Sequence, residues 1–188
     1  MNPLHTSRLI LRNWQERDRS VFHRINSDDR VMEFFPFRRD RAQSNALLDE
    51  LRADIDAIGY GFAAVEIAST GECVGFAGLS PVEDLPVFRH GDVEIGWRLA
   101  HEHWGKGYAT EAASAWLHHA FVTLELDEVI SFAVETNHRS TAVMDRLGMH
   151  RDPGGDFDYP KVPDDRPQLR RFVLYRIGRE EWRRRHSL

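Results

Sequence analysis

The stretch HEHWGKGYATEAASAWLHHA, residues 101–120, restricts the possible folds more than any other part of this sequence. Two glycines, Gly105 and Gly107, flank a lysine, and an alanine-rich run follows at once. A glycine turn that opens a helix gathers unpaired backbone N–H groups, and such a turn often binds a phosphate. The apolar residues of the run recur at the spacing of one helix face, which predicts that they belong to the core: Ala109, Ala113, Trp116, Leu117, Ala120 and Phe121.

Length and composition are those of an ordinary globular protein. The chain has 188 residues, of which 41% are apolar and 29% charged, so we expect one domain over 1–188. The net charge of −5 argues against a nucleic-acid partner, and no run of 18 apolar residues predicts a membrane span. Residues 1–14 lack the apolar centre of a secretion signal, and the one cysteine, Cys73, excludes an internal disulfide. These features favour a cytoplasmic protein.

The periodic segments predict an α/β or α+β domain with a mixed sheet. Expected strands are 8–14, 61–68, 73–82, 92–100, 128–134 and 169–177, of which the second and third form a hairpin. Expected helices are 18–26, 40–58, the helix after the glycine turn, and 137–148. Residues 31–37 read as a turn or short helix, and 83–91 and 151–168 as loops. Gly96, inside the fourth strand, suggests a bulge or a close approach of backbone.

The glycine turn can be compared with three phosphate-binding patterns. The P-loop pattern fails, because Gly107 follows Lys106 where Ser or Thr is required. The dinucleotide pattern G-x-G-x-x-G fits poorly, because Thr110 occupies the third glycine position. The pattern [QR]-x-x-G-x-[GA], which holds the pyrophosphate of coenzyme A, fits at Gly107 and Ala109 but has Trp104 at its first position.

On these residues the chain resembles the GNAT superfamily of N-acetyltransferases, most closely the branch that acetylates the N-terminal alanine or serine of ribosomal proteins. The shared segments are TSRLILRNW, VEIGWRL, HWGKGYATEA and NHRSTAVMDRLGM. The resemblance covers residues 6–177 and leaves 178–188 as a basic C-terminal tail. It implies a mixed, mostly antiparallel twisted sheet of about six to seven strands, with helices on both faces and splayed central strands that hold the coenzyme.

The resemblance also implies acetyl-CoA as the co-substrate, with no metal. Backbone N–H groups of the turn would face the pyrophosphate, and the helix dipole adds about half a positive charge there. The pantetheine arm would pair with the strand 92–100, whose N–H near Trp97 would face the thioester carbonyl. The residues expected to bind the coenzyme are Trp97, Leu99, Gly105, Lys106, Gly107, Tyr108, Ala109, Thr110 and Asn137.

Two residues are candidates for proton transfer. Glu94 matches a glutamate that accepts the amine's proton in this superfamily; the alternative is a strand glutamate that faces solvent or pairs with an arginine. Ser140 matches a proposed proton donor to the thiolate, the alternatives being an ordinary first-turn helix residue or protonation by solvent. Met144 stands where many relatives have a tyrosine for this step. His101 and His103 are too few for a metal site and are expected to be structural or solvated.

The resemblance places residues 34–37 and the loop 151–168 on the acceptor side. Phe34, Phe35 and Phe37 would either line an acceptor pocket or cover the core. An acidic rim would attract a cationic amine, or would form only a solvated loop; its carboxylates are Asp152, Asp156, Asp158, Asp164, Asp165, Glu83 and Asp84.

The sequence thus predicts an acetyl-CoA-dependent N-acetyltransferase that transfers acetyl directly to a primary amine in a ternary complex. The acceptor would be a protein N-terminus or a small-molecule amine, such as an aminoglycoside or a polyamine. A non-catalytic acyl-CoA-binding sensor is the alternative from another class, and it would require neither Glu94 nor Ser140. The chain could also form a homodimer.

Overall fold

The computed structural model describes residues 1–82, 85, 87–89 and 91–187. Two compact units can be distinguished, one made of residues 1–80 and 96–116 and the other of residues 81–95 and 117–188. They are called unit 1 and unit 2 below. Of the loop predicted at 83–91, Glu83, Asp84, Pro86 and His90 lie outside the described residues. Among the helices of the described chain, none is both long and apolar enough to cross a membrane.

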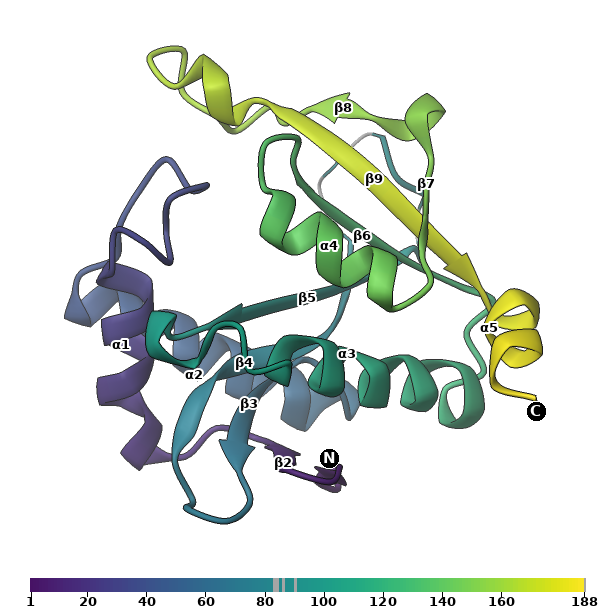
Figure 1. The fold of residues 1–188 in the computed structure, drawn as a ribbon. Helices are drawn as coiled ribbons and strands as arrows, with labels where there is room; N and C mark the ends of the chain where they lie inside the picture. Colours follow the sequence, from purple (N-terminus) through teal and green to yellow (C-terminus); the bar gives the residue numbers. More distant parts are fainter. Residues whose placement is uncertain (83–84, 86, 90, 188) are drawn as a thin grey trace. The chain divides into compact units, whose positions relative to one another are not determined.

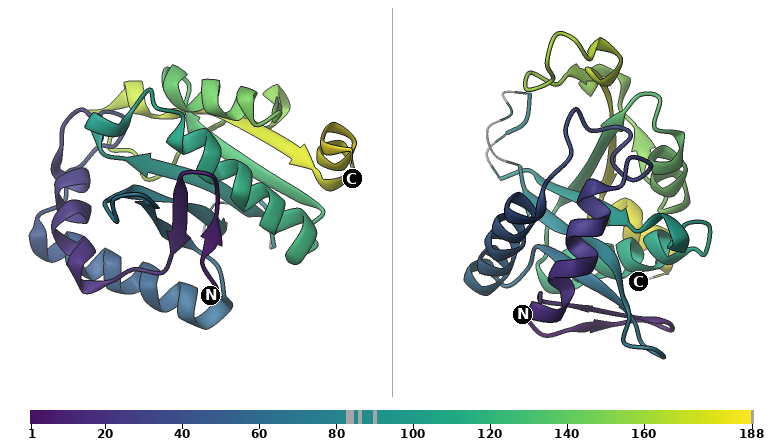
Figure 2. Two further views of the ribbon diagram at one scale, coloured as in Figure 1. Left: turned by 60° about the horizontal axis from the view of Figure 1, so that its bottom comes forward. Right: turned by 90° about the vertical axis from the view of Figure 1, so that its left-hand side faces the viewer.

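Unit 1 is built on antiparallel strands that follow one another in chain order. The N-terminal strands β1 (Leu4–His5) and β2 (Leu9–Arg12) lie side by side in Figure 2. β2 then pairs with β3 (Phe62–Ile67), and β3 with β4 (Cys73–Pro81), which confirms the predicted hairpin. The end of β5 (Val93–Leu99) runs beside β4, where the Ala100 N–H donates to the Val74 carbonyl at 2.9 Å.

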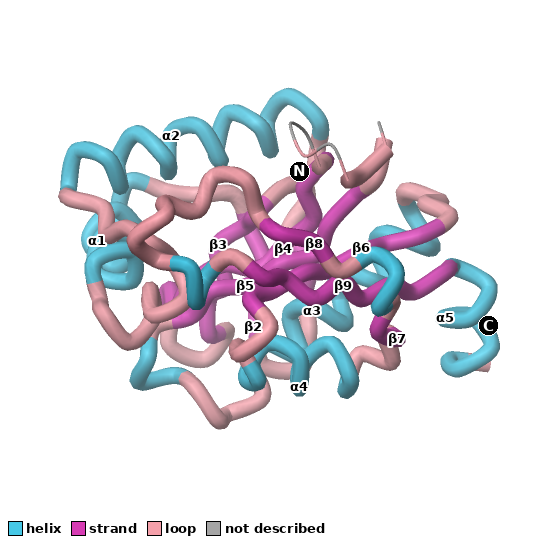
Figure 3. Tube along the Cα trace, turned by 90° about the horizontal axis from the view of Figure 1, so that it is seen from above, coloured by secondary structure: helices cyan, strands magenta, loops and turns pink. Residues whose placement is uncertain are grey.

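Helices cover both faces of these strands. In Figure 3, α2 (Arg41–Ile58) and α3 (Tyr108–His118) lie on opposite sides of β3 and β4. The predicted start and end of α2 are confirmed, because Asp40 caps the Gln43 N–H and Gly59 closes the helix at φ 87°. α1 (Arg19–Ser27) confirms the other predicted N-terminal helix, and residues 31–36 form turns and bends.

The apolar face predicted for the alanine-rich helix is buried. Ala113, Trp116 and Leu117 are at most 1% exposed, and so are Ala120 and Phe121 in the π-helical segment His119–Thr123 that follows α3. Ala109, at the first turn, remains partly exposed. The periodicity of the sequence therefore identified the buried face of this helix.

Unit 2 is built around β9 (Arg171–Gly178) and β6 (Glu128–Val134), which pair antiparallel with Phe132 opposite Leu174. The start of β5 pairs parallel with β6, Glu94 lying opposite Ile130, and the Ser131 hydroxyl donates to the Ile95 carbonyl at 2.9 Å. α4 (His138–Arg146) lies along β6 (Figure 1). The mixed, mostly antiparallel α/β class is therefore confirmed.

The described chain has nine strands, whereas the sequence predicted six to seven. The additional ones are β1 and two pieces of the predicted loop 151–168 and its flank, β7 (His150–Arg151) and β8 (Phe157–Asp158), which both pair with β9. Each of the three is two residues long, too short to show the alternation by which a strand is recognised in sequence.

The C-terminal residues form a helix, α5 (Arg179–His186), instead of a simple basic tail. Its Trp182 is 2% exposed and packs on Phe121 with 5.4 Å between ring centroids. The helix thus packs on the protein's own surface within unit 2. The sequence did not predict this contact, because Trp182 is the one large apolar residue in the charged segment 179–186.

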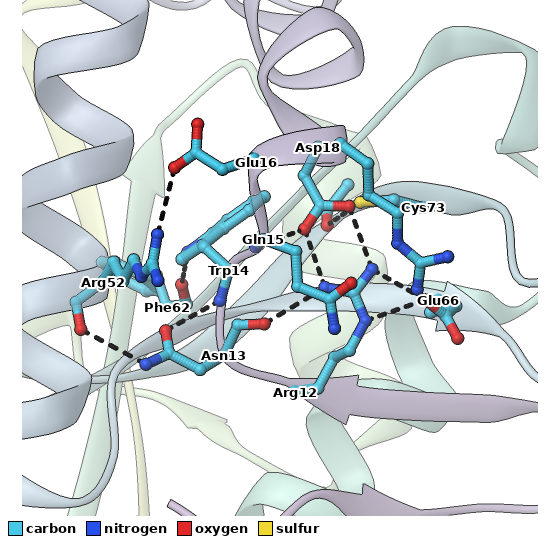
Figure 4. A network of polar contacts seen from close by, with 12 residues as sticks. Arg12, Asn13, Trp14, Gln15, Glu16, Asp18, Arg52, Phe62, Glu66 and Cys73 are labelled. Carbon is cyan, nitrogen blue, oxygen red and sulfur yellow. Dashed lines mark hydrogen bonds and ion pairs between the residues drawn. The ribbon is translucent and has the colours of Figure 1, made fainter.

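A buried ion network joins β2, β3 and the start of α1 in unit 1 (Figure 4). The Arg12 guanidinium donates two hydrogen bonds to Asp18, at 2.7 and 2.9 Å, and one to Glu66 at 2.8 Å. All three side chains are almost fully buried. Burial disfavours the charge of Arg12, but the two carboxylates outweigh this effect and raise its pKa. Arg12 is thus a structural arginine with its charge fully compensated.

Replacing Asp18 with alanine should lower the free energy of unfolding by about 3 kcal/mol, because it leaves a buried guanidinium with half its compensation. Chemical denaturation at pH 7 measures the change. Glu16→Ala is the matched control, because Glu16 bonds Arg19 and Arg52 at an exposed position and should leave the midpoint almost unchanged. Equal losses in both variants would contradict the structural role assigned to the network.

Candidate functional site

The glycine turn of unit 1 has the backbone conformation that its sequence predicts. Gly105 and Gly107 have φ values of 73° and 80°, a left-handed region that other residues adopt only with strain. A Cβ atom at Gly105 would meet nothing within 4 Å, so the space over this residue is open. Gly105, Lys106 and Gly107 are exposed, and α3 begins directly after them at Tyr108. The first N–H groups of α3 therefore lie next to an open, exposed glycine turn.

The N-terminal segment braces this turn. The Arg8 guanidinium donates to the Lys106 carbonyl at 2.9 Å and to the Glu111 carboxylate at 2.6 Å, and it lies 4.8 Å from the centre of the Tyr108 ring. Glu111 also accepts hydrogen bonds from the Thr6 hydroxyl at 2.6 Å and the Arg8 N–H at 2.9 Å. Burial opposes ionisation of Glu111, but these hydrogen bonds outweigh it and lower its pKa.

Sequence reasoning did not assign this bracing role to Thr6, Arg8 and Glu111. The only signal was that TSRLILRNW and HWGKGYATEA both belong to the shared segments. About a hundred residues separate the partners along the chain, so no local pattern pairs them.

Trp104 ties the turn to the end of β5. Its indole N–H donates to the Leu99 carbonyl at 2.9 Å, and its ring lies 4.8 Å from the ring of His101. Trp104 is therefore a positioning residue at the place where the coenzyme pattern usually has Gln or Arg. Leu99 is buried and Trp97 partly exposed, both on β5. A Cβ at Gly96 would lie 3.0 Å from the Phe62 ring, so this glycine marks a close approach.

Glu94 lies on β5 within unit 2, where it is partly exposed. No hydrogen bond or ion pair joins its carboxylate to another residue of the described chain, so the alternative of an arginine partner is wrong. Burial among protein atoms raises its pKa from 4.5 to about 7. The Tyr159 pKa is raised in turn, by its own burial and then by the charge of Glu94. A carboxyl group with this pKa can exchange a proton near neutral pH.

Asn137 and Ser140 lie at the start of α4. The Asn137 side-chain oxygen accepts from the Ser140 N–H at 3.2 Å, so Asn137 is the helix cap that the sequence predicts. Both residues are partly exposed, and the Ser140 hydroxyl lies in the first turn. Met144, in the place of the tyrosine, is 1% exposed and has no proton to give.

The acidic loop is largely neutralised within unit 2. Four of its five described aspartates each pair with an arginine: Asp152 with Arg176 at 2.7 Å, Asp156 with Arg151 at 2.6 Å, Asp158 with Arg171 at 3.3 Å and Asp164 with Arg170 at 2.6 Å. The predicted attraction for a cationic amine is correspondingly weak. Glu83 and Asp84 lie outside the described residues.

His103 is buried beside the turn, 6% exposed, with its Nε2 atom 3.3 Å from the Glu72 carboxylate. His101 packs on Trp104. Within the residues that the structure describes, no three His, Cys, Asp or Glu side chains gather as a metal site would require.

The sequence matches the family described as Acetyltransferase (GNAT) domain over residues 8–150, about three quarters of the chain. The chain belongs to the GNAT acetyltransferase family. As a member of this family it is an N-acetyltransferase. GNAT acetyltransferases use acetyl-CoA as co-substrate, and the glycine turn lies within the matched residues.

Individual relatives agree with the family. An FsC-acetyl coenzyme A-N(2)-transacetylase from Aspergillus fumigatus is 33% identical over 193 aligned positions, which cover 96% of this chain and 78% of that protein. An acetyltransferase structure from Agrobacterium tumefaciens is 29% identical with a TM-score of 0.73, covering 95% of each chain. A GNAT-family structure from Bacillus anthracis has a TM-score of 0.78 at 24% identity, covering 96% of this chain and all of that one; it shows the fold alone.

The raised pKa of Glu94 predicts a pH-dependent stability. The folded state binds more protons than the unfolded state between pH 4.5 and about 7, so stability falls as the pH rises through this range. Relative to Glu94→Gln, the wild type should lose about 2 kcal/mol of unfolding free energy between pH 5 and pH 8, after allowance for partial exposure. Urea denaturation of wild type and Glu94→Gln at several pH values measures this difference in unfolding free energy. Glu50→Gln, at an exposed position of α2, is the control, and parallel curves for wild type and Glu94→Gln would refute the shift.

Proposed function

We propose that this protein is an acetyl-CoA-dependent N-acetyltransferase that transfers acetyl directly to a primary amine. The observation that carries the proposal is the open glycine turn, with two left-handed glycines directly before the start of α3. A helix N-terminus behind such a turn offers several N–H donors and a favourable dipole to one anionic group. The pyrophosphate of coenzyme A is an anion of this kind.

The turn residues fit a pyrophosphate. No atom lies within 4 Å of a Cβ placed on Gly105, and the nearest atom to one on Gly107 is the cationic Arg8 Nη2 at 3.4 Å. Gly105, Lys106, Gly107, Tyr108, Ala109 and Thr110 would bind the phosphates through their backbone, and Asn137 and the β5 residues Trp97 and Leu99 would hold the pantetheine arm. The Aspergillus relative, whose name specifies acetyl coenzyme A, supports this co-substrate.

Acetyl-CoA supplies the acetyl group as a thioester. In the proposed reaction the amine nitrogen forms a bond to the thioester carbon, and the C–S bond breaks. Glu94 would accept the proton that the amine loses, and its pKa of about 7 suits a base at neutral pH. The Trp97 N–H would stabilise the carbonyl oxygen as it becomes negative. Ser140 or a water molecule would return a proton to the thiolate.

Direct transfer is favoured over an acyl-enzyme. Cys73, the one cysteine of the sequence, is 8% exposed on β4. Burial and the negative charge of Asp18 raise its pKa to about 12, so the thiol stays protonated and weakly nucleophilic. A ternary complex of enzyme, acetyl-CoA and amine follows.

Two acceptor classes suit this chemistry. The likeness of HWGKGYATEA to enzymes acting on ribosomal-protein N-termini supports a protein N-terminus, and the N(2)-transacetylase relative supports a nitrogen acceptor of another kind. An α-amino group, with pKa ~8, needs little help to lose its proton at pH 7, whereas a lysine amine at ~10.4 needs a base. A non-catalytic sensor would gain nothing from a Glu94 that has no partner among the described residues and that lowers stability at neutral pH.

Gly107→Glu should weaken acetyl-CoA binding at least about tenfold, because a side chain and a negative charge enter the proposed pyrophosphate site. Isothermal titration calorimetry measures the Kd. Gly59→Glu is the matched control: it places the same residue at another left-handed, exposed glycine, at the end of α2, and should leave the Kd unchanged. An unaltered Kd in Gly107→Glu would overturn the assignment of the turn.

Glu94→Gln should lower kcat more at pH 7 than at pH 9. At pH 9 most α-amino acceptors are already neutral, so a base is no longer needed. Thiol release from acetyl-CoA, followed across this pH range with one amine acceptor, gives both values, and Glu50→Gln serves as control. The same fractional loss at both pH values would argue against a proton-accepting role.

A further inference from the structure

Arg98, near the end of β5 in unit 1, lies in an aromatic setting. Its guanidinium carbon is 4.2 Å from the centre of the Phe35 ring and 5.1 Å from that of Phe76. The side chain is partly exposed. Within the described residues its only side-chain hydrogen bond goes to the Asn26 amide oxygen, at 2.6 Å. Since a guanidinium has five donors, most of its hydrogen-bonding capacity is open to another group.

Asn26 is built to hold this arginine in place. It is fully buried in α1, and its side-chain N–H donates to the Phe22 carbonyl at 2.8 Å, which directs the amide oxygen toward Arg98. The Asn26 carbonyl accepts from the Arg39 N–H at 3.0 Å. One buried residue therefore positions the side chain of Arg98 and the backbone of Arg39.

Arg39 adds a second positive charge to the same cluster. Its guanidinium carbon lies 4.9 Å from the centre of the Phe37 ring, which is 6.2 Å from the Phe35 ring beside Arg98. Its Nε atom is buried and has no hydrogen-bond partner. Burial, and then the charge of Arg39, lower the pKa of Arg98 to about 9. Two like charges are thus held together on adjacent rings.

The described residues provide no carboxylate for either arginine. Other arginines of unit 1 differ in this respect: Arg12 bonds Asp18 and Glu66, and Arg38, next to Arg39 in sequence, pairs with Asp29 at 2.7 Å. An arginine withdrawn from water is rarely left without an acidic partner. Arg98 and Arg39 therefore form a preorganised anion-binding pair whose anion the chain itself does not provide.

We propose that Arg98 and Arg39 bind a carboxylate of the acceptor, so that the acceptor is a small primary amine that also carries a carboxylate, as an amino acid does. The inference rests on the proposed acetyl transfer. Arg98 lies on β5, the strand that also carries Glu94. A bidentate guanidinium–carboxylate pair suits the open donors of Arg98. A peptide N-terminus has no carboxylate at its first residue unless the side chain supplies one.

Calorimetric titration with the twenty L-amino acids and their C-terminal amides tests the proposal, with and without saturating coenzyme A. At least one amino acid should bind about tenfold tighter than its amide. In Arg98→Gln the two should bind within twofold of each other, while Arg98→Lys retains part of the preference. The Kd of coenzyme A should stay within twofold of wild type, which a general loss of structure would not allow.

Arg52→Gln, which removes a partly exposed arginine of α2, is the control and should keep the full preference. Arg39→Gln provides a second variant if Arg98→Gln does not fold, and it should reduce the preference as well. Equal binding of acids and amides by the wild type, or a preference that survives both Gln variants, would overturn the proposal. Failure of coenzyme A to bind would refute the proposed transfer, while the titrations without coenzyme still decide the carboxylate site.

Discussion

The compensation of charge withdrawn from water is the constraint on which this structure depends. Where opposite charges fully compensate a buried charge, the group has a structural role. The Arg12 guanidinium donates hydrogen bonds to Asp18 and Glu66 and so joins two strands to the start of α1. On β5, Glu94 and Arg98 have no oppositely charged partner among the described residues. Their pKa values move toward neutrality, in opposite directions. Keeping such groups costs stability, and we interpret that cost as the requirement of a chemical task.

The glycine turn follows a related rule for backbone groups. Unpaired N–H groups at a helix start need a partner, and two left-handed glycines keep the space before α3 free of side chains. Distant residues stabilise this open turn. Arg8 and Glu111 fix it from the N-terminal segment, and the Trp104 indole ties it to β5. An exposed glycine turn depends on such bracing, because no side chain of its own glycines defines its shape.

Much of the fold could be predicted because its signals are local. The helix 40–58 carries its own cap and closing glycine, and the hairpin has alternating strands around a short turn. The prediction failed for β7 and β8, because these short strands form only by pairing with β9. It also failed for α5, which is held by the burial of one tryptophan, Trp182. For the candidate site, the sequence indicated the glycine turn and Glu94 but not the distant residues that contact functional side chains. Nothing near Arg98 in the sequence indicates that Asn26 accepts a hydrogen bond from it.

The sequence by itself determined the family and the glycine turn that we propose as the phosphate site, because glycine spacing and helical periodicity depend on neighbours in the chain. Tertiary structure decided the rest. Among the described residues it left Glu94 without a partner and raised its pKa, paired four of the loop aspartates with arginines, and placed Arg98 and Arg39 together without a carboxylate. Desolvation and the nearest opposite charge depend on which distant segments the fold brings close, and no local pattern of residues records them.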